Sequence, residues 1–308
     1  MEDIKDTEIR ILGDAGGEQS STQASSESAP VQSQKRHRQR MLWWMIVGVL
    51  VLLSVTTLVV VHCVRTSDKE GEAVFEKAAR VLPPHPLREW IAECDAMEHD
   101  STTTYRGTLF YNITVNDIPM RFMCPINAKP RLAVGYKCLQ DTANTVLLWQ
   151  AADIRADNQK IVGAFVLHGK PLSWGLSKRG YCAIIDDSVT IGVLDNSPLF
   201  EEATERNGDF FRQYPLVDNG VLVENELKTK CVRRALCELE GRVVVAETST
   251  TESLHDFAQA LVDVGVDNAI YLVGSSAIGW WMDTDGVGTP SGNWESLVYK
   301  NISFIIWK

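Results

Sequence analysis

The sequence lacks the short motifs that mark many hydrolases and metalloproteins. Its 308 residues contain no C-x-x-C pair, no H-E-x-x-H and no G-x-S-x-G. A structural zinc site, a zinc protease and a serine-hydrolase elbow therefore have no support. Histidine is scarce, with 6 residues. We expect His168 in a turn and His255 on a helix to be solvated rather than catalytic. No internal repeat is evident.

Positive charge is also in short supply, because 30 Lys and Arg stand against 40 Asp and Glu, a net charge of −10. Phosphate backbones attract basic surfaces, so this balance argues against a nucleic-acid partner. A small phosphate-bearing substrate needs only a local site. Asp283, Asp285 and Gly286 resemble the start of a calcium loop, but the terminal Glu of that motif is missing. We expect no cofactor, and a divalent cation has no supporting motif.

One long apolar run stands out, "MLWWMIVGVLVLLSVTTLVVVHCV", and it carries no charge. About 20 apolar residues span a bilayer as a helix. The run predicts a transmembrane signal-anchor helix over 41–64; the alternative is a core helix buried on every face. Basic residues 35–40 precede it, and excess Lys and Arg marks the cytoplasmic side. We therefore expect a single-pass protein with a cytoplasmic N-terminus, a periplasmic C-terminal domain and the lipid bilayer as a partner.

The flanking segments differ in composition. Residues 1–40 are rich in Ser, Gln and Gly, which predicts a disordered cytoplasmic tail. Residues 65–104 show helical spacing of apolar residues and predict a helical linker or stalk. Residues 105–308 contain short segments of alternating apolar and polar residues, which is typical of strands, and they predict one extracytoplasmic domain.

The chain has 7 cysteines, and all except Cys63 lie beyond the predicted span. An oxidising compartment permits disulfides there, although their connectivity does not follow from sequence. The short spacing of Cys231 and Cys237 suggests one pair. Independent buried thiols are the alternative.

Short turns divide residues 105–308 into many strands. We expect one helix late in this region, with Ser253 as a cap and Gly265 near its end. Strands that follow one another in this way predict an α+β fold: a mixed or antiparallel sheet built largely from hairpins, with few helices, preceded by one transmembrane helix. The turn signals are Asn116-Asp117, His168-Gly169, Asp186-Asp187-Ser188, Asn219-Gly220 and Glu240-Gly241.

Polar residues at strand ends are the candidates for chemistry. Asp153 and Arg155 follow the apolar segment "TVLLWQAA", and Arg233 and Arg234 open a strand. Residues 274–276, Gly-Ser-Ser, close another strand. The same residues also fit ordinary turns and surface ion pairs, so residue types alone leave both interpretations open.

The order of several segments resembles the phosphodiester glycosidase domain family, the catalytic fold of the enzyme that removes N-acetylglucosamine from a GlcNAc-1-phosphodiester. The resemblance covers about 148–285. A membrane-anchored version is similar to proteins of gut Bacteroidota. The matching segments are "WQAADIRADNQKIVGAFVLHGKPLSWG", "RGYCAIIDDSVTIG", "YPLVDNGVLVEN", "VRRALCELEGRVVVAE" and "SLHDFAQALVDVGVDNAIYLVGSS".

The resemblance implies hydrolysis of the bond between an anomeric carbon and a phosphodiester oxygen in a glycan. Such chemistry needs a carboxylate, and it needs either a general acid or cations that hold the leaving phosphate. It implies a catalytic role for Arg233, which aligns with the family's arginine, as a phosphate clamp. We expect Asp153 to supply the catalytic carboxylate, with Asp283 as the alternative, although neither acid follows from the alignment. Substrate-binding roles fall to Arg155, Gly274, Ser275, Ser276 and Trp280, the last by stacking on sugar.

The sequence departs from the family pattern at two positions. Asp153 stands where the family usually has Asn, and Val273 stands where it has the Asp of Asp-Gly-Gly. Valine cannot act as an acid, a base or a ligand. Two expectations follow: a diverged hydrolase that uses Asp153, or a catalytically inactive module of the same fold that binds glycan.

Overall fold

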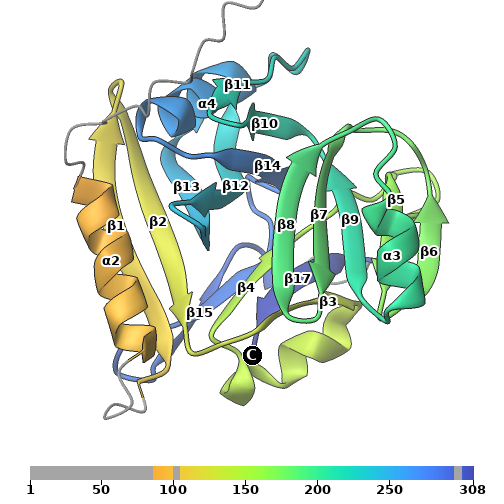
Figure 1. Ribbon diagram of the computed structural model, residues 1–308, viewed down its shortest axis with the longest axis horizontal. Coiled ribbons are helices and arrows are strands. Elements are labelled where there is room, and N and C mark those ends of the chain that lie inside the picture. Colours follow the sequence, from red (N-terminus) through yellow and green to blue (C-terminus); the bar gives the residue numbers. More distant parts are fainter. Residues whose placement is uncertain (1–85, 100–104, 295–299) are drawn as a thin grey trace, which may run out of the picture. The chain divides into compact units, whose positions relative to one another are not determined.

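The computed structural model describes residues 86–99, 105–294 and 300–308, all within a compact unit that spans Val81–Lys308. The predicted tail, 1–40, and the predicted span, 41–64, lie outside these residues. No helix of the described ranges is long and apolar enough to cross a membrane. Their fold is α+β and rich in sheet, as the turns predict (Figure 1). Its α-helices are α2 (Pro86–His99), α3 (Leu199–Glu205) and α4 (Leu254–Asp263).

Three sheets make up the domain, and each strand pairing within them is antiparallel. The seven-stranded sheet has the order β1 (Gly107–Val115), β2 (Ile118–Ile126), β13 (Arg242–Glu252), β12 (Cys231–Leu239), β14 (Asn268–Leu272), β10 (Pro215–Asp218) and β11 (Val221–Leu222). One five-stranded sheet has the order β16 (Gly288–Ser291), β15 (Gly279–Met282), β4 (Leu147–Gln150), β17 (Ser303–Trp307) and β3 (Pro130–Val134). The other has the order β6 (Lys170–Trp174), β5 (Ala164–Leu167), β9 (Asp209–Gln213), β7 (Gly180–Ile185) and β8 (Ser188–Val193).

The predicted hairpin turns are confirmed, except that Ser188, predicted in a turn, is the first residue of β8. Each is a two-residue connection in which both residues have positive φ, the backbone that matches the twist of antiparallel strands and that Asn, Asp and Gly adopt most readily. Their φ values are 50° and 62° for Asn116 and Asp117, 47° and 74° for His168 and Gly169, 50° and 63° for Asp186 and Asp187, 50° and 74° for Asn219 and Gly220, and 51° and 77° for Glu240 and Gly241.

The predicted late helix is confirmed as α4. The side chain of Ser253 accepts a hydrogen bond from the backbone N–H of Asp256, and Gly265 follows the helix at a φ of 89°. Helix α3 was not predicted, because it is only 7 residues long and has no side-chain cap at Pro198. Two 3-10 turns, η1 (Tyr136–Gln140) and η2 (Thr142–Asn144), were not predicted either.

One core lies between the seven-stranded sheet and its helices, α2 and α4. Helix α2 buries Leu87, Trp90, Ile91 and Cys94, the i, i+3, i+4, i+7 spacing of one helical face. Figure 1 shows α2 lying along β1 and β2. Although α2 falls in the segment predicted as a linker, it belongs to the packed core of the domain.

A second core joins all three sheets. One five-stranded sheet contributes Trp149 from β4 and Ile305 from β17, and the other contributes Phe211 from β9. The seven-stranded sheet contributes Leu236 from β12 and Leu272 from β14, and all five side chains are fully buried. This shared core fixes the ends of β4, β9 and β14 close to one another. The packing of this core therefore determines which polar residues at these strand ends come into contact.

The suggested pairing of Cys231 with Cys237 is wrong. Both residues lie on β12, and both thiols are free. Six residues of extended strand span roughly 20 Å, whereas a disulfide needs its two Cα atoms about 4.4–6.8 Å apart.

Candidate functional site

The ends of strands from the three sheets are tied together by hydrogen bonds. The backbone N–H of Val273 donates to the carbonyl of Gln150 at 3.2 Å. The side-chain amide of Gln213 donates to the carbonyl of Ala151 at 3.2 Å. The residues that follow β4, β9 and β14 therefore form one neighbourhood, which we call the strand-end site.

Asp153 meets a buried lysine in this site. Its carboxylate forms an ion pair with Lys178, whose side chain is 5% exposed while that of Asp153 is 33% exposed. The ammonium of Lys178 also donates to the side-chain oxygen of Gln213 at 2.8 Å. Burial lowers the pKa of Lys178 from its ordinary value, and the charge of Asp153 opposes that shift. Asp153 and Lys178 are thus a carboxylate and a proton-bearing cation held in contact.

A tyrosine covers this ion pair and leads to a small pocket. The ammonium of Lys178 lies 4.5 Å from the ring centroid of Tyr214. Burial raises the pKa of Tyr214, and the charge of Asp153 adds to the shift. Lys178, Arg179 and Tyr214 line a cavity of about 330 Å³ that Glu224 also lines. The wall of the pocket therefore carries two cations, Lys178 and Arg179, and two carboxylates, Glu224 and Glu226. Asp153, the partner of Lys178, adds a further carboxylate next to it.

Arg233 lies in the same neighbourhood but is itself buried. Its Nε donates to the carbonyl of Glu252 at 2.7 Å, and another of its nitrogens donates to the carbonyl of Thr229. Its guanidinium carbon is 5.7 Å from the ring centroid of Tyr271, and that ring meets Tyr214 edge-on at 6.5 Å. Arg233 is thus connected to Lys178 through two aromatic rings, and its donors are directed to backbone carbonyls.

Gly274 lies against Tyr271. Its backbone N–H donates to the Tyr271 hydroxyl at 3.1 Å. A Cβ added at Gly274 would lie 2.2 Å from the carbonyl oxygen of Val232, so only glycine fits this approach of β14 to β12. Asp153, Arg233 and Gly274, which the sequence places far apart, are therefore linked through Lys178, Tyr214 and Tyr271.

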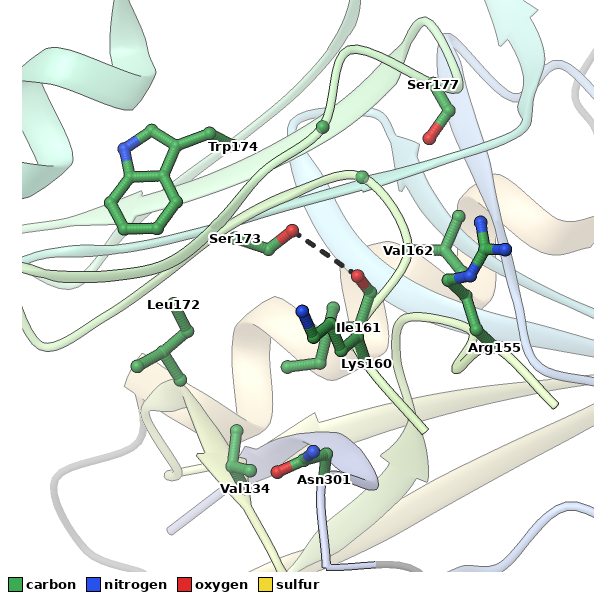
Figure 2. Close-up of a pocket in the computed structure, with 12 residues that line it drawn as sticks. Val134, Arg155, Lys160, Ile161, Val162, Leu172, Ser173, Trp174, Ser177 and Asn301 are labelled. Carbon is green, nitrogen blue, oxygen red and sulfur yellow. Dashed lines mark hydrogen bonds between the residues drawn. The ribbon is translucent and has the colours of Figure 1, made fainter. Parts of the chain in front are cut away.

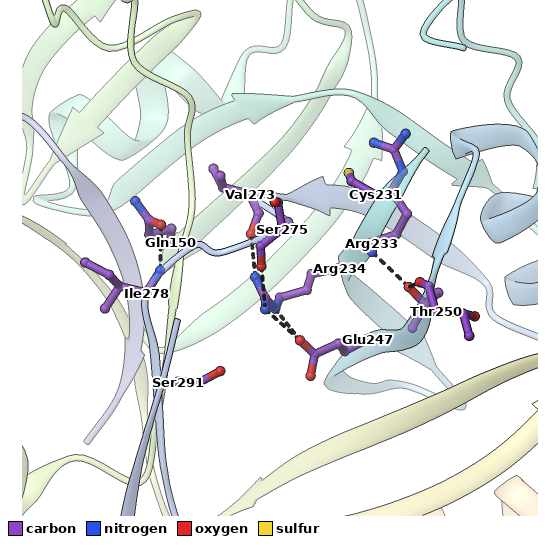
Figure 3. Close-up of polar contacts among 12 residues, drawn as sticks. Gln150, Cys231, Arg233, Arg234, Glu247, Thr250, Val273, Ser275, Ile278 and Ser291 are labelled. Atoms are coloured by element: carbon purple, nitrogen blue, oxygen red, sulfur yellow. Dashed lines mark hydrogen bonds and ion pairs between the residues drawn. The ribbon is translucent and has the colours of Figure 1, made fainter. Parts of the chain in front are cut away.

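The arginine that supports the 273–276 loop is Arg234. Figure 3 shows Arg233 and Arg234 pointing in different directions from β12. Arg234 pairs with Glu247 at 2.7 Å and donates to the carbonyls of Val273 at 3.0 Å and Ser275 at 3.3 Å. Its guanidinium carbon lies 4.1 Å from the centroid of the Trp149 ring. Arg234 therefore anchors the loop to the shared core.

The remaining predicted site residues of this loop have separate positions. Ser275 and Ser276 are exposed, and Ser275 has a φ of 55°. Trp280 is half-buried on β15, where its ring lies 6.3 Å from that of Trp294 and its indole N–H donates to the carbonyl of Thr145 at 3.4 Å. Its predicted stacking on sugar stays a prediction, because its described contacts are with protein groups.

Arg155 lines a larger groove of about 580 Å³. Its guanidinium pairs with Asp157, with Nε–Oδ1 at 2.9 Å. Lys160, Ser173 and Trp174 line the same groove, and Trp174 is 66% exposed. Figure 2 shows Trp174 and Arg155 at opposite ends of this groove. Residues 175–179 border both cavities, since Gly175 and Ser177 line the groove and Lys178 and Arg179 line the pocket.

Sequence reasoning missed Lys178, Tyr214 and Tyr271. Each is an ordinary loop or strand residue by composition. One signal for Lys178 exists, because "LSKRG" places two cations directly before a strand.

No group of three or more His, Cys, Asp or Glu within the described ranges is placed to hold a metal ion. Asp283 accepts hydrogen bonds from the backbone of Asp285 at 3.0 Å and Val287 at 2.8 Å, which shapes the turn between β15 and β16.

Comparisons with known proteins give similarity in structure alone. No family model matches the sequence, and no curated protein does. The zebrafish N-acetylglucosamine-1-phosphodiester alpha-N-acetylglucosaminidase catalytic domain, auto-inhibited by its pro-peptide, is 14% identical, with a TM-score of 0.48 over 68% of this chain and 84% of that chain. A hypothetical protein from Synechocystis is 12% identical, with a TM-score of 0.51 over 67% of this chain and 62% of that chain. The second similarity shows a related fold.

Proposed function

We propose that this chain is a membrane-anchored, extracytoplasmic hydrolase that cleaves a sugar-1-phosphodiester of the GlcNAc-1-phosphate type in a glycan. The observation that carries the proposal is the contact of Asp153 with the buried Lys178 beside a pocket that Arg179 also lines. A carboxylate and cations within one site are what such a bond cleavage requires. The anchor is the predicted span 41–64; the Bacteroidota type of the protein stays a prediction.

The proposed reaction uses Asp153 as the base. Its carboxylate takes a proton from water, the water oxygen bonds to the anomeric carbon, and the bond from that carbon to the phosphodiester oxygen breaks. The leaving group is a phosphate monoester, and Lys178 and Arg179 stabilise its charge. Arg233 acts as a phosphate clamp in the sequence-based hypothesis; in the proposal it supports the site through Tyr271, which its guanidinium faces.

The test follows both possible products. The full-length chain, purified in detergent, is incubated with a methyl ester of N-acetylglucosamine-1-phosphate. Free N-acetylglucosamine and methyl phosphate are the expected products, because the proposed cleavage is at the sugar carbon. Release of sugar-1-phosphate and methanol would mean cleavage at phosphorus and would contradict the proposal, as would recovery of intact substrate. The matched variant is Asp153→Asn, which removes the base and keeps the shape of the side chain.

A second candidate function is a glycan-binding module without turnover. The groove favours it, because an exposed indole and the cations Arg155 and Lys160 suit an anionic saccharide. Val273 in place of an acid and the neutralisation of Asp153 by Lys178 point the same way.

Replacing Trp174 with alanine tests whether the groove binds saccharide, which the hydrolysis proposed at the Asp153–Lys178 pair does not require. We expect about 3- to 10-fold weaker binding of an anionic oligosaccharide by calorimetry, since stacking on one aromatic ring contributes about 0.5–1.5 kcal/mol. Because Trp174 is 66% exposed, the unfolding free energy should change by no more than about 0.5 kcal/mol. The control is Val221→Ala, an exposed apolar residue on β11. Equal affinity in wild type and the Trp174 variant would remove the groove from the binding function.

A further inference from the structure

Two cysteines lie together at the interface between helix α2 and the seven-stranded sheet. Cys94 comes from α2 and Cys124 from β2, and both are fully buried. Both thiols are free, and one guanidinium, that of Arg242, reaches the Sγ of Cys124 and the carboxylate of Asp95, the residue next to Cys94. Cys237, from β12, belongs to the same core, whereas Cys182 lies in the core that joins the three sheets.

An arginine is directed at one of the two sulfurs. The Nε of Arg242, from β13, donates to the Sγ of Cys124 at 2.8 Å. The same guanidinium pairs with Asp95 at 2.7 Å and Glu98 at 2.7 Å, both on α2, and donates to the carbonyl of Pro125 at 3.3 Å. It is nearly buried, at 12% exposure of its side chain. A cation in this position stabilises the thiolate form of a cysteine.

The two thiols are therefore unequal. The hydrogen bond with Cys94 lowers the pKa of Cys124, and the charge of Arg242 adds to this effect while burial opposes it. The same hydrogen bond and burial raise the pKa of Cys94. Cys124 is thus the more acidic of the two thiols, and the thiolate is the form that attacks in thiol–disulfide exchange.

We propose that Cys94 and Cys124 form a disulfide that joins helix α2 covalently to strand β2. The oxidant is a low-molecular-weight disulfide such as oxidised glutathione. Because both sulfurs are buried while α2 is docked, the oxidant reaches them when α2 separates from the sheet, and Arg242 on β13 stays beside Cys124 on β2. The Cys124 thiolate then attacks one sulfur of this oxidant, which forms a mixed disulfide and releases one thiolate. Cys94 then gives its proton to the released thiolate and attacks the Cys124 sulfur, which releases the second thiolate. That thiolate takes up from solvent the proton that Cys124 gave up when it ionised. In sum, two cysteine thiols and one disulfide give one protein disulfide and two small thiols.

The link has a mechanical consequence for an anchored protein. Helix α2 follows the predicted membrane span along the chain, and its buried face is held to the sheet by apolar packing and by the Arg242 ion pairs. A bond from Cys94 to Cys124 closes a loop of about 30 residues, which restricts the unfolded chain and stabilises the docked helix. The link does not use the residues of the proposed hydrolysis, because neither cysteine nor Arg242 contacts Asp153 or Lys178, whose partners are Gln213 and Tyr214.

Peptide mapping of the full-length chain tests the proposal. The chain is equilibrated in an oxidised glutathione buffer, alkylated under denaturing conditions and digested. We expect a cross-linked pair of peptides that contain Cys94 and Cys124, and a melting temperature that falls by roughly 5–15 °C on reduction. The Cys94→Ala variant should lose both the cross-link and the reductant effect, whereas Cys182→Ala, which changes another fully buried thiol, should keep both. Full alkylation of Cys94 and Cys124 in the oxidised wild type would overturn the proposal, as would a cross-link of either to another cysteine.

Discussion

Replacing Arg234 with leucine should destabilise the domain by about 3–5 kcal/mol, the cost of leaving one member of a buried ion pair without its partner. The side chains of Arg234 and Glu247 are only 3% and 16% exposed. The variant strands the Glu247 carboxylate and also removes donors from the carbonyls of Val273 and Ser275. Chemical denaturation of the full-length chain, followed by tryptophan fluorescence, measures the change in unfolding free energy.

A double variant distinguishes the cost of the unpaired Glu247 carboxylate from the cost of the hydrogen bonds lost to the 273–276 loop. In Arg234→Met combined with Glu247→Leu, no charge is left unpaired, so the cost should be well below the sum of the two single variants. The control is Arg206→Leu, which breaks surface pairs with Asp186 and Glu202 and should leave the denaturation midpoint close to that of the wild type. A midpoint for Arg234→Leu as high as that of the control would contradict the anchoring role.

The sequence alone could not show which of the two arginines, Arg233 or Arg234, holds the 273–276 loop. Neighbouring residues of a strand point to opposite faces of a sheet, so one of Arg233 and Arg234 must face Tyr271 and the other Trp149. Arg234 lies opposite Glu247 of β13 and Leu272 of β14, and this pairing places it on the Trp149 side. The placement arises from pairing with strands farther along the chain, which no local pattern records.

Local features, in contrast, could be predicted. The two-residue turns such as Asn116-Asp117 need residues that tolerate positive φ, and the cap of α4 needs a side-chain acceptor such as Ser253. These requirements are met within a few residues of chain. The contact of Asp153 with Lys178 depends instead on the meeting of two sheets, with Gln213 from β9 as the link between them.

The charge of Lys178 should be essential to turnover if the proposed function holds. Replacing it with methionine removes the cation that faces the leaving phosphate, and we expect a loss of about 100- to 10,000-fold in kcat, the range for groups of this kind. Asp153 is 33% exposed, so water can solvate its carboxylate and the fold should survive. Lys129→Met, which breaks the exposed pair with Asp187, is the matched control and should keep its activity.

The pH profile gives the sharper test of Lys178. Because burial lowers the pKa of this ammonium, the wild-type rate should decline on the alkaline side as the pH rises towards the ordinary lysine value of 10.5. Deprotonation of Lys178 cannot cause such a decline by unfolding the protein. The folded state binds the Lys178 proton less tightly than the unfolded state, so its contribution to stability rises with pH between the folded pKa and 10.5.

Lys178→Arg then separates a role as counter-charge from a role as proton donor. A guanidinium stays protonated across this range. A leaving phosphate monoester needs a positive charge more than a proton, so we expect the arginine variant to keep its activity within about tenfold of wild type and to lose the alkaline decline. An arginine variant as inactive as the methionine variant would mean that Lys178 donates a proton. A wild-type profile without decline below 10.5 would remove Lys178 from the reaction altogether.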